Sequence, residues 1–152
     1  RDVLEFQRVR VPALYQPLYE RPKPLVPRNL RFEITERIAS NGDILTPLVE
    51  NDVIKCVETI QSLGLEAVAV CYLNSYANPI HEIRTGEILR DLLGGTYISI
   101  SAEVLPQMRE YERTSTTVVN AYVGPPVKKY IQSMTDNKLI FDLIIWSVHD
   151  PL

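Results

Sequence analysis

The sequence feature that most constrains the fold is a continuous apolar run, Leu65–Leu73, which reads LEAVAVCYL. A strand that is apolar at every position is typical of a sheet covered on both faces, because neither side of it is left for water. Helical periodicity precedes this run between Pro47 and Gly64 and returns after it between Asn78 and Leu93. A second strand pattern at Tyr97–Val104 and a last helix at Gln107–Met134 complete the series. This order predicts an α/β fold with a small, mostly parallel sheet and flanking helices.

An N-terminal antiparallel hairpin is predicted ahead of the first helix. Apolar and polar residues alternate along Leu30–Ile38, and Asn41–Gly42 offers the positive φ values that a tight hairpin turn needs. The strand at Tyr97–Val104 alternates in the same way. The residues predicted to face outward from it are Ser99, Ser101 and Glu103. We expect the last helix to break or kink at Gly124–Pro126, because proline removes a helical hydrogen bond.

Composition narrows the class of protein. The chain has 152 residues, of which 23% are charged, and a net charge of −3, which suits one globular domain. This acidic balance argues against a nucleic-acid partner, since a phosphate-binding surface needs clustered Lys and Arg. No apolar run approaches the ~20 residues that cross a bilayer, so we expect a cytoplasmic protein with no membrane partner. Cys56 and Cys71 are predicted to be small core residues rather than a disulfide.

The two ends of the chain differ from its middle. Residues 1–28 form a proline-rich segment that should run extended over the surface, since each proline fixes φ and removes a donor. Residues 135–152 form a divergent apolar tail, in which Leu139–Trp146 could make a strand. Because the chain begins with Arg rather than Met, we expect a fragment or a processed product.

Polar side chains follow both predicted central strands at the point where each strand ends. In open α/β sheets, ligands gather outside the carboxyl ends of parallel strands, so we expect the two runs to share one edge of the sheet. The first run supplies Asn74, Ser75, Asn78, His81 and Glu82. The second run supplies Glu103, Arg109, Glu110, Glu112, Arg113, Thr114 and Ser115.

His81 and Glu82 allow two interpretations. They could be a general base with its partner, or two metal ligands. Alternatively, both lie in the first turn of a helix, where Glu82 interacts with the helix dipole and His81 caps the helix or faces water. The sequence favours the second interpretation, so no metal site is predicted and this pair is only a weak candidate for one.

The run Glu112–Thr117 also has more than one interpretation. Its charges and hydroxyls could bind an anionic substrate or a phosphate. They could equally form an inter-domain contact surface or an ion-paired helix start. Four consecutive hydroxyl residues are poor helix formers, so their presence needs a reason. Asn120 recurs on the same face as Thr116 and Thr117, and it needs partners if it is buried.

Nucleotide-binding motifs are absent from the sequence. None of the six glycines belongs to a GxGxxG, a GxxxxGK[ST] or an acidic-Gly-Gly-Thr phosphate loop. The single Gly-Gly pair follows a predicted helix, which is the wrong end for binding phosphate. We therefore expect no cofactor to bind to this chain alone.

Four blocks of the sequence resemble one family in order and spacing. They are RDVLEF from Arg1, ERIASNGDILTPL from Glu36, AVAVCYLNSYANPIHE from Ala67, and EVLPQMREYERTSTTVVNAYVGP from Glu103. These blocks resemble the hydantoinase A / 5-oxoprolinase family, most closely N-methylhydantoinase A. On this resemblance, residues 1–134 are an N-terminal-type domain that is incomplete, because it lacks the family's phosphate loop.

The resemblance implies an ATP-dependent hydrolase that opens a small cyclic amide such as 5-oxoproline or a hydantoin. The implied fold of the complete enzyme is a sugar-kinase/actin-like ATPase, with ATP and Mg²⁺ as cofactors. The implied chemistry is phosphorylation of the amide oxygen, followed by attack of water on the activated carbon. The implied partner is the rest of the enzyme or a hydantoinase B-type subunit, so this segment should be inactive alone.

Roles for individual residues follow from these blocks and from the predicted sheet edge. The candidates for catalysis are Glu112, Arg113 and Ser115. The candidates for substrate binding are Glu103, Arg109, Thr114, Asn120, Asn74 and Ser75. Asn74 stands where members of the family often have His, and Ala102 stands where Ser or His is common.

Two other functions are compatible with the sequence. One is a non-catalytic α/β interaction module that docks a partner through the helix with the Thr-Ser-Thr-Thr run. The other is a subunit of an ATP-dependent ketone carboxylase, since such subunits belong among the relatives of this family.

Overall fold

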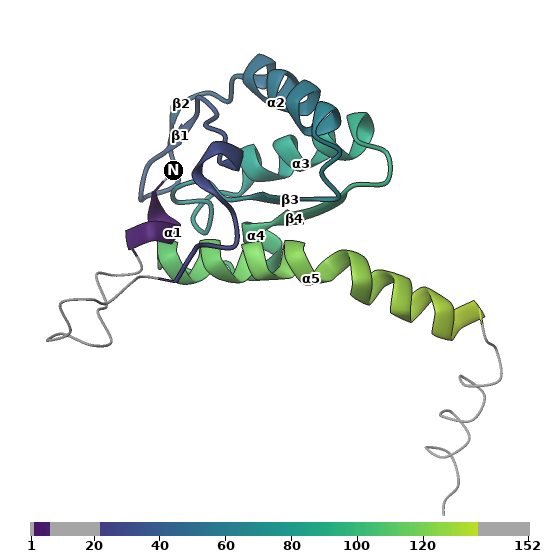
Figure 1. The fold of residues 1–152 in the computed structure, drawn as a ribbon. Helices are drawn as coiled ribbons and strands as arrows, with labels where there is room; N and C mark the ends of the chain where they lie inside the picture. Colours follow the sequence, from purple (N-terminus) through teal and green to yellow (C-terminus); the bar gives the residue numbers. More distant parts are fainter. Residues whose placement is uncertain (1, 7–21, 137–152) are drawn as a thin grey trace, which may run out of the picture.

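A parallel pair of strands forms the middle layer of the fold (Figure 1). The strands are β3 (Ala67–Val70) and β4 (Tyr97–Ile100), and they are hydrogen-bonded to each other. Helices α2 (Glu50–Ser62) and α3 (Ile80–Leu92) cover one face of the pair. The long helix α5 (Glu110–Asp136) covers the other face. The predicted α/β order with parallel central strands is therefore confirmed.

This computed structural model describes residues 2–6 and 22–136. The expectations for the prolines within residues 7–21 and for the apolar tail after residue 136 lie outside the described residues.

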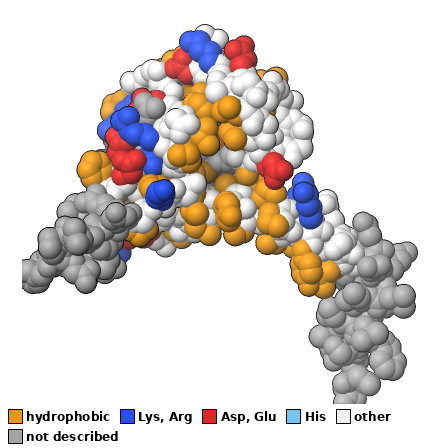
Figure 2. Space-filling view, viewed as in Figure 1, with side chains coloured by type: hydrophobic (Ala, Val, Ile, Leu, Met, Phe, Trp, Pro, Cys, Tyr) orange, Lys and Arg blue, Asp and Glu red, His pale blue; other side chains and the backbone are white. Residues whose placement is uncertain are grey.

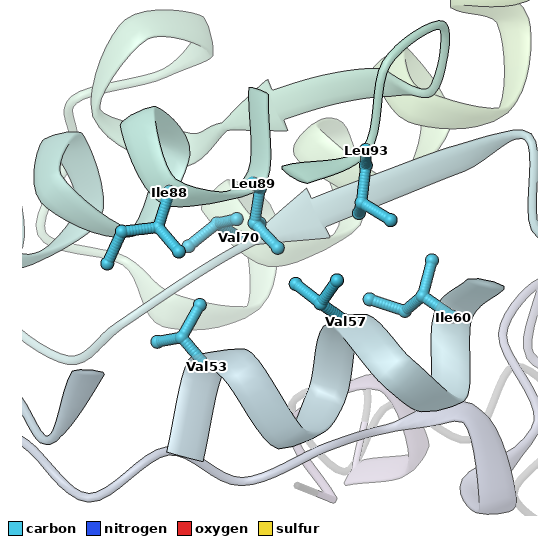
Figure 3. Packing of buried hydrophobic residues seen from close by; sticks show 7 residues of the cluster. All are labelled: Val53, Val57, Ile60, Val70, Ile88, Leu89 and Leu93. Atoms are coloured by element: carbon cyan, nitrogen blue, oxygen red, sulfur yellow. The ribbon is translucent and has the colours of Figure 1, made fainter. Parts of the chain in front are cut away.

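The hydrophobic core lies between α2, α3 and β3 (Figure 3). Its fully buried members are Val53, Val57, Ile60, Val70, Ile88, Leu89 and Leu93. Spacings of three and four residues place the α2 members on one side of that helix, as its periodicity predicted. Gly64 ends the α2 segment with a φ of 61°, which confirms the predicted left-handed termination.

The apolar run Leu65–Leu73 is less enclosed than its composition suggested. Only Ala67–Val70 forms a strand, and the first three residues of that strand are half-buried. Within the described ranges β3 pairs with β4 alone, so one edge of β3 carries no neighbouring strand.

The second strand is shorter than predicted, and the prediction that its serines face outward was wrong. β4 ends at Ile100, and Ser101–Val104 forms the short helix α4 instead of continuing the strand. Ser99 and Ser101 are buried, although the alternation placed them outward. The reason is tertiary, because α5 covers the face that carries Ser99 and a buried carboxylate binds the start of α4.

The N-terminal hairpin is present but short. Its strands are β1 (Arg37–Ile38) and β2 (Ile44–Thr46), which pair antiparallel with an irregular register. Residues 28–30 form the 3₁₀ helix η2 rather than the start of a strand. In the turn, Gly42 has a φ of 94°, whereas Asn41 does not have a positive φ. The turn therefore needs one left-handed residue, not the two that were expected.

Two asparagine side chains attach this hairpin to the loop after β3. Asn74 Nδ2 donates a hydrogen bond to the carbonyl of Ile38 at 2.9 Å, and Asn78 Nδ2 donates one to the carbonyl of Gly42 at 2.8 Å. Asn74 adopts a φ of 58°, a left-handed conformation that asparagine tolerates better than most residues. Asn78 also accepts a hydrogen bond from the N–H of Ile80, although the helix pattern predicted from Asn78 begins only at Ile80, with Pro79 as its N-cap.

The described part of the N-terminal segment packs against the domain. Residues 3–6 form one helical turn, α1, so this part is not extended as predicted. Arg31 donates to the carboxylate of Glu5 at 3.0 Å and to the carbonyl of Val26 at 2.9 Å. Arg28 forms an ion pair with Asp2 at 3.0 Å.

Helix α5 continues through Pro125 and Pro126 without a break. Its axis changes direction in its second half (Figure 1), so a bend rather than an interruption accommodates the two prolines. Cys56 and Cys71 are both free thiols, as predicted. In the described part of the chain, no helix is long and apolar enough to span a membrane.

Gly124 provides a test of how closely α5 packs on the sheet. A Cβ atom at Gly124 would collide with the ring of Tyr97. Such overpacking costs ~1–3 kcal/mol, which exceeds the gain of up to ~1 kcal/mol from replacing glycine by alanine in a helix. We expect Gly124→Ala to lower the free energy of unfolding by about 1–2 kcal/mol in urea titrations.

Gly94→Ala is the matched control, because nothing lies within 4 Å of the position of its Cβ. Equal effects of the two substitutions would show that α5 does not pack against Tyr97 as described.

Candidate functional site

The two polar runs meet at the carboxyl edge of the parallel strands, as the topology predicted. The loop after β3 contributes Ser75, and the residue after β4 is Ser101. Their hydroxyl oxygens lie 3.2 Å apart, and both residues are buried. This contact brings together two segments that are 26 residues apart in the sequence.

Glu82 lies at the centre of this edge and is fully buried, with 0% exposure. It sits in the first turn of α3, and its Oε1 accepts hydrogen bonds from the backbone N–H of Tyr72 at 2.6 Å and from the Ser101 hydroxyl at 2.7 Å. Its Oε2 accepts one from the N–H of Ala102 at 2.8 Å. One side chain therefore holds the chain just beyond both strands.

Arg113 supplies the opposite charge and is only 1% exposed. Its Nη1 lies 3.7 Å from Glu82 Oε1 and donates to the hydroxyls of Ser75 and Ser101, the latter at 3.1 Å. Its Nε has no hydrogen-bond partner among the described residues. Removing one partner of a buried ion pair is strongly destabilising, because the remaining charge is left without compensation. We call Ser75, Glu82, Ser101 and Arg113 the edge cluster.

The hydroxyl run of α5 turns mostly toward its own helix. Thr117 donates to the carbonyl of Arg113 at 2.7 Å, and Ser115 donates to the carbonyl of Glu112 at 3.2 Å. Such bonds to a preceding turn explain how a helix accommodates these residues. The Ser115 hydroxyl is thus engaged with the backbone rather than presented as a nucleophile.

The other predicted substrate-binding residues lie outside the edge cluster. Glu103 is exposed and forms an ion pair with Arg90 at 3.3 Å. Asn120 accepts hydrogen bonds from the hydroxyls of Ser99 at 2.8 Å and Tyr97 at 3.4 Å, which meets its predicted need for partners. Arg109 is exposed. Of the predicted residues in the two runs, the structure brings together Ser75, Glu82 and Arg113.

His81 and Glu82 do not act as a pair, and the expectation that His81 caps the helix or faces water was wrong. The two side chains bind different partners, because adjacent residues point to different sides of α3. His81 Nδ1 lies 2.9 Å from Glu36 Oε2, and both side chains are buried. This contact adds a third attachment between the hairpin region and the segment after β3. In the described ranges, no group of three or more His, Cys, Asp or Glu is placed to hold a metal ion.

An apolar cavity of about 370 Å³ lies on the α5 side of β3, bounded also by α2 and the N-terminal segment. Residues that line it include Val3, Leu25, Val53, Cys56, Cys71 and Thr114. Burial raises the pKa of the Cys71 thiol to about 12, and it also raises the pKa of Cys56. Neither thiol is therefore activated as a nucleophile at neutral pH.

Sequence reasoning missed three members of these contacts. Ser101 was placed outward by the strand alternation, and Glu36 was given no role in the sequence analysis. The backbone N–H of Tyr72 carries no sequence signal at all. A serine directly after a short strand and an acidic residue in the helix before that strand could have suggested the edge cluster, but many such pairs never meet.

The fold and the edge cluster define an α/β segment with a rigid, polar strand edge, and comparison with known proteins gives its family. Residues 1–93 match the family described as the hydantoinase/oxoprolinase N-terminal region. The chain therefore belongs to the hydantoinase/oxoprolinase family, as the four sequence blocks indicated.

Named relatives support this membership. The chain is 44% identical to the uncharacterized protein MJ0964 of Methanocaldococcus jannaschii, over 90% of this chain and 20% of that protein. It is 40% identical to caprolactamase subunit alpha of Pseudomonas jessenii, over 78% of this chain and 17% of that protein. The crystal structure of the ATP-dependent caprolactamase from the same organism superposes with a TM-score of 0.82 at 37% identity, covering 88% of this chain and 20% of that chain.

Two further relatives are named as a 5-oxoprolinase and as a subunit of a carboxylase. One is the 5-oxoprolinase of Saccharomyces cerevisiae, 33% identical over 57% of this chain and 7% of that protein. Another is the acetophenone carboxylase gamma subunit of Aromatoleum aromaticum, 37% identical over 76% of this chain and 16% of that protein. The chain thus spans about a fifth or less of the length of these relatives.

The edge cluster predicts a large effect of neutralising Glu82. Glu82→Gln leaves Arg113 as an uncompensated buried charge and places an amide N–H₂ against groups that donate. We expect the free energy of unfolding to fall by about 3–5 kcal/mol in urea titrations. Glu103→Gln, an exposed control with one ion pair, should change it by no more than about 1 kcal/mol.

Combining Glu82→Gln with Arg113→Met should cost less than the sum of the two single substitutions, because neither charge is then left alone. Additive losses would contradict the proposed coupling between the two side chains.

The raised pKa of Cys71 predicts slow alkylation. With a pKa of about 12, its thiolate fraction at pH 8 is about 10⁻⁴. Iodoacetamide should modify Cys71 at least about 100-fold more slowly in the folded protein than in urea, as followed by peptide mass spectrometry. The rate should keep rising with pH beyond pH 9, since a raised pKa keeps the thiol protonated there. Equal rates in folded and unfolded protein would show that Cys71 is not buried.

Proposed function

We propose that this chain is part of an ATP-dependent hydrolase that opens a cyclic amide such as 5-oxoproline, a hydantoin or a lactam. The observation that carries the proposal is the likeness to the ATP-dependent caprolactamase over 88% of the chain at 37% identity. The edge cluster supports it, because a rigid strand edge is where α/β proteins hold small ligands.

The sequence motifs and the described residues, 2–6 and 22–136, do not fit a nucleotide or metal site. The sequence has no phosphate loop, and the described residues offer no cluster of metal-binding side chains. ATP and Mg²⁺ are therefore assigned to other parts of the complete enzyme, in a sugar-kinase/actin-like framework. In this proposal residues 1–134 are the incomplete N-terminal-type domain, and residues 135–152 are a divergent tail.

Glu82 and Arg113 act as positioning residues in this proposal. Both are buried, so they do not reach a substrate directly, but they hold the loops that start at Ser75 and Ser101. Arg113, a candidate for catalysis on sequence grounds, is thereby assigned to the support of the site. Asn74 is assigned the same supporting role, since its side chain binds the hairpin.

Exposed residues beside the edge cluster are assigned to substrate contact. Glu103 in α4 and Arg109, directly before α5, are both exposed and can face a ligand held by another lobe. An arginine offers a fork of donors for a carboxylate, such as the one that 5-oxoproline carries. Glu112 keeps a partly buried position at the start of α5 and stays a candidate for proton transfer.

A ketone carboxylase subunit is the second candidate function. The relative named acetophenone carboxylase gamma subunit favours it, and so does the subunit beta of acetone carboxylase from Xanthobacter autotrophicus, 28% identical. In both functions the partner is the rest of the enzyme or a further subunit. The third candidate function is a non-catalytic interaction module. None of the relatives named above has a name that favours it.

Substrate assays on a full-length protein that carries this chain test the proposal. We expect ATP-dependent hydrolysis of at least one among 5-oxoproline, N-methylhydantoin and caprolactam, and no activity of the 152-residue chain alone. Ketone carboxylation with bicarbonate in place of hydrolysis would favour the carboxylase. Folded protein without either activity would favour the interaction module.

The assignment of Arg109 has its own test. Arg109→Ala should lower kcat/KM at least about tenfold, the scale of one lost charged hydrogen bond, without changing Tm by more than about 2 °C. Lys55→Ala on α2 is the control, since it also removes an exposed positive charge. Unchanged kcat/KM in the Arg109 variant would remove this residue from the site.

A further inference from the structure

Helix α5 carries side chains suited to burial on two opposite sides. On one side Thr117, Val118, Ala121 and Gly124 are buried against the strands. On the other side a row of large apolar residues is 40–70% exposed. We call this row the outer stripe; its members are Val119, Tyr122, Val123, Val127, Tyr130 and Ile131.

The outer stripe is continuous because of its spacing. Positions 119, 123 and 127 follow one another at four residues, and positions 130 and 131 lie three and four residues after 127, as neighbours along the side of an α-helix do. Tyr122 widens the stripe beside Val119 and Val123. Figure 2 shows hydrophobic side chains exposed along α5.

A helix with apolar residues on two sides is typical of a buried layer, because each apolar side gains free energy only when something covers it. Contiguous exposed apolar patches are uncommon on soluble monomers and mark interaction surfaces. The sheet covers the inner side of α5, and no described residue covers the outer stripe.

The length of the relatives indicates what covers the outer stripe. The 137 residues that align with MJ0964 make up 20% of that protein, so about four fifths of its chain lies outside the match. The caprolactamase structure gives the same proportion. A polypeptide of that length offers far more apolar surface than this segment needs.

We propose that the outer stripe of α5 is an intramolecular docking surface, covered by an apolar face of the rest of the full-length polypeptide. The proposal rests on the proposed function only in taking this chain as one part of a longer enzyme. Helix α5 would then pack against the strands of this segment on one side and against the rest of the full-length polypeptide on the other. The end of α5 reaches beyond the strands (Figure 1), and Tyr130 and Ile131 are 64% and 55% exposed.

The test compares one substitution in two settings, the 152-residue chain and a full-length protein that carries it. Val127→Asp places a charge in the outer stripe. We expect it to lower the Tm of the full-length protein by at least about 5 °C, because an unpaired charge is then buried. The same substitution should leave the Tm of the 152-residue chain within about 1 °C, since position 127 is solvent-exposed there.

Gln132→Asp is the matched control, with the same change of charge at an exposed position of the same helix off the stripe. This control substitution should leave the Tm of both the 152-residue chain and the full-length protein unchanged. Hydrogen exchange tests the same proposal on the unsubstituted protein, so it does not depend on whether a variant folds. The amides of residues 127–136 should exchange at least about tenfold more slowly in the full-length protein than in the 152-residue chain.

Three results would overturn the proposal. The first is unchanged stability and unchanged exchange in the full-length protein. The second is a loss of stability in the 152-residue chain itself, which would mean that the chain covers its own stripe. The third is a dimer of the chain, seen by light scattering, that Val127→Asp dissociates. A full-length protein without hydrolase activity that still shows the expected Tm pattern would refute the proposed function and keep the interface.

Discussion

The buried carboxylate of Glu82 is the interaction on which the carboxyl edge of the strands depends. It accepts hydrogen bonds from the segment after β3 and from the first residues of α4, and it lies beside Arg113 of α5. The segment after β3 and the α4–α5 region, which are about 30 residues apart in the sequence, therefore meet at one charged group. Because a buried charge is tolerated only when its partners are in place, this edge forms as a unit or not at all.

Because the edge depends on buried groups, the residues that hold its segments in place differ from the residues that can touch a ligand. Arg113 has the residue type and the setting of a catalytic group, yet it lies inside the protein and binds Glu82, Ser75 and Ser101. A guanidinium so enclosed positions loops rather than touching a ligand. In the function proposed above, exposed neighbours such as Arg109 and a lobe that carries the nucleotide form the surface that meets a substrate.

The exposed apolar surface of α5 fits the proposal that this chain is one part of a longer polypeptide. α5 is covered by the sheet on one side and carries the outer stripe on the other. The relatives are about five times longer than this chain, and the caprolactamase shares its fold at a TM-score of 0.82. The described residues combine a buried local core with an exposed apolar stripe, as the proposed place of this segment in a longer polypeptide requires.

The sequence by itself determined the order of the elements, the parallel strands, the helical faces of the core and the family. These follow from local periodicity and from blocks of residues in fixed order, which need no knowledge of distant contacts. It also predicted that the two polar runs meet at the carboxyl edge of the strands, because parallel strands end at the same edge of a sheet. Only the tertiary structure decided that Ser101 points inward, that His81 binds Glu36 and that Arg113 is buried with Glu82. The physical reason is that the burial of a polar side chain depends on partners from other elements, and alternation along one strand carries no information about them.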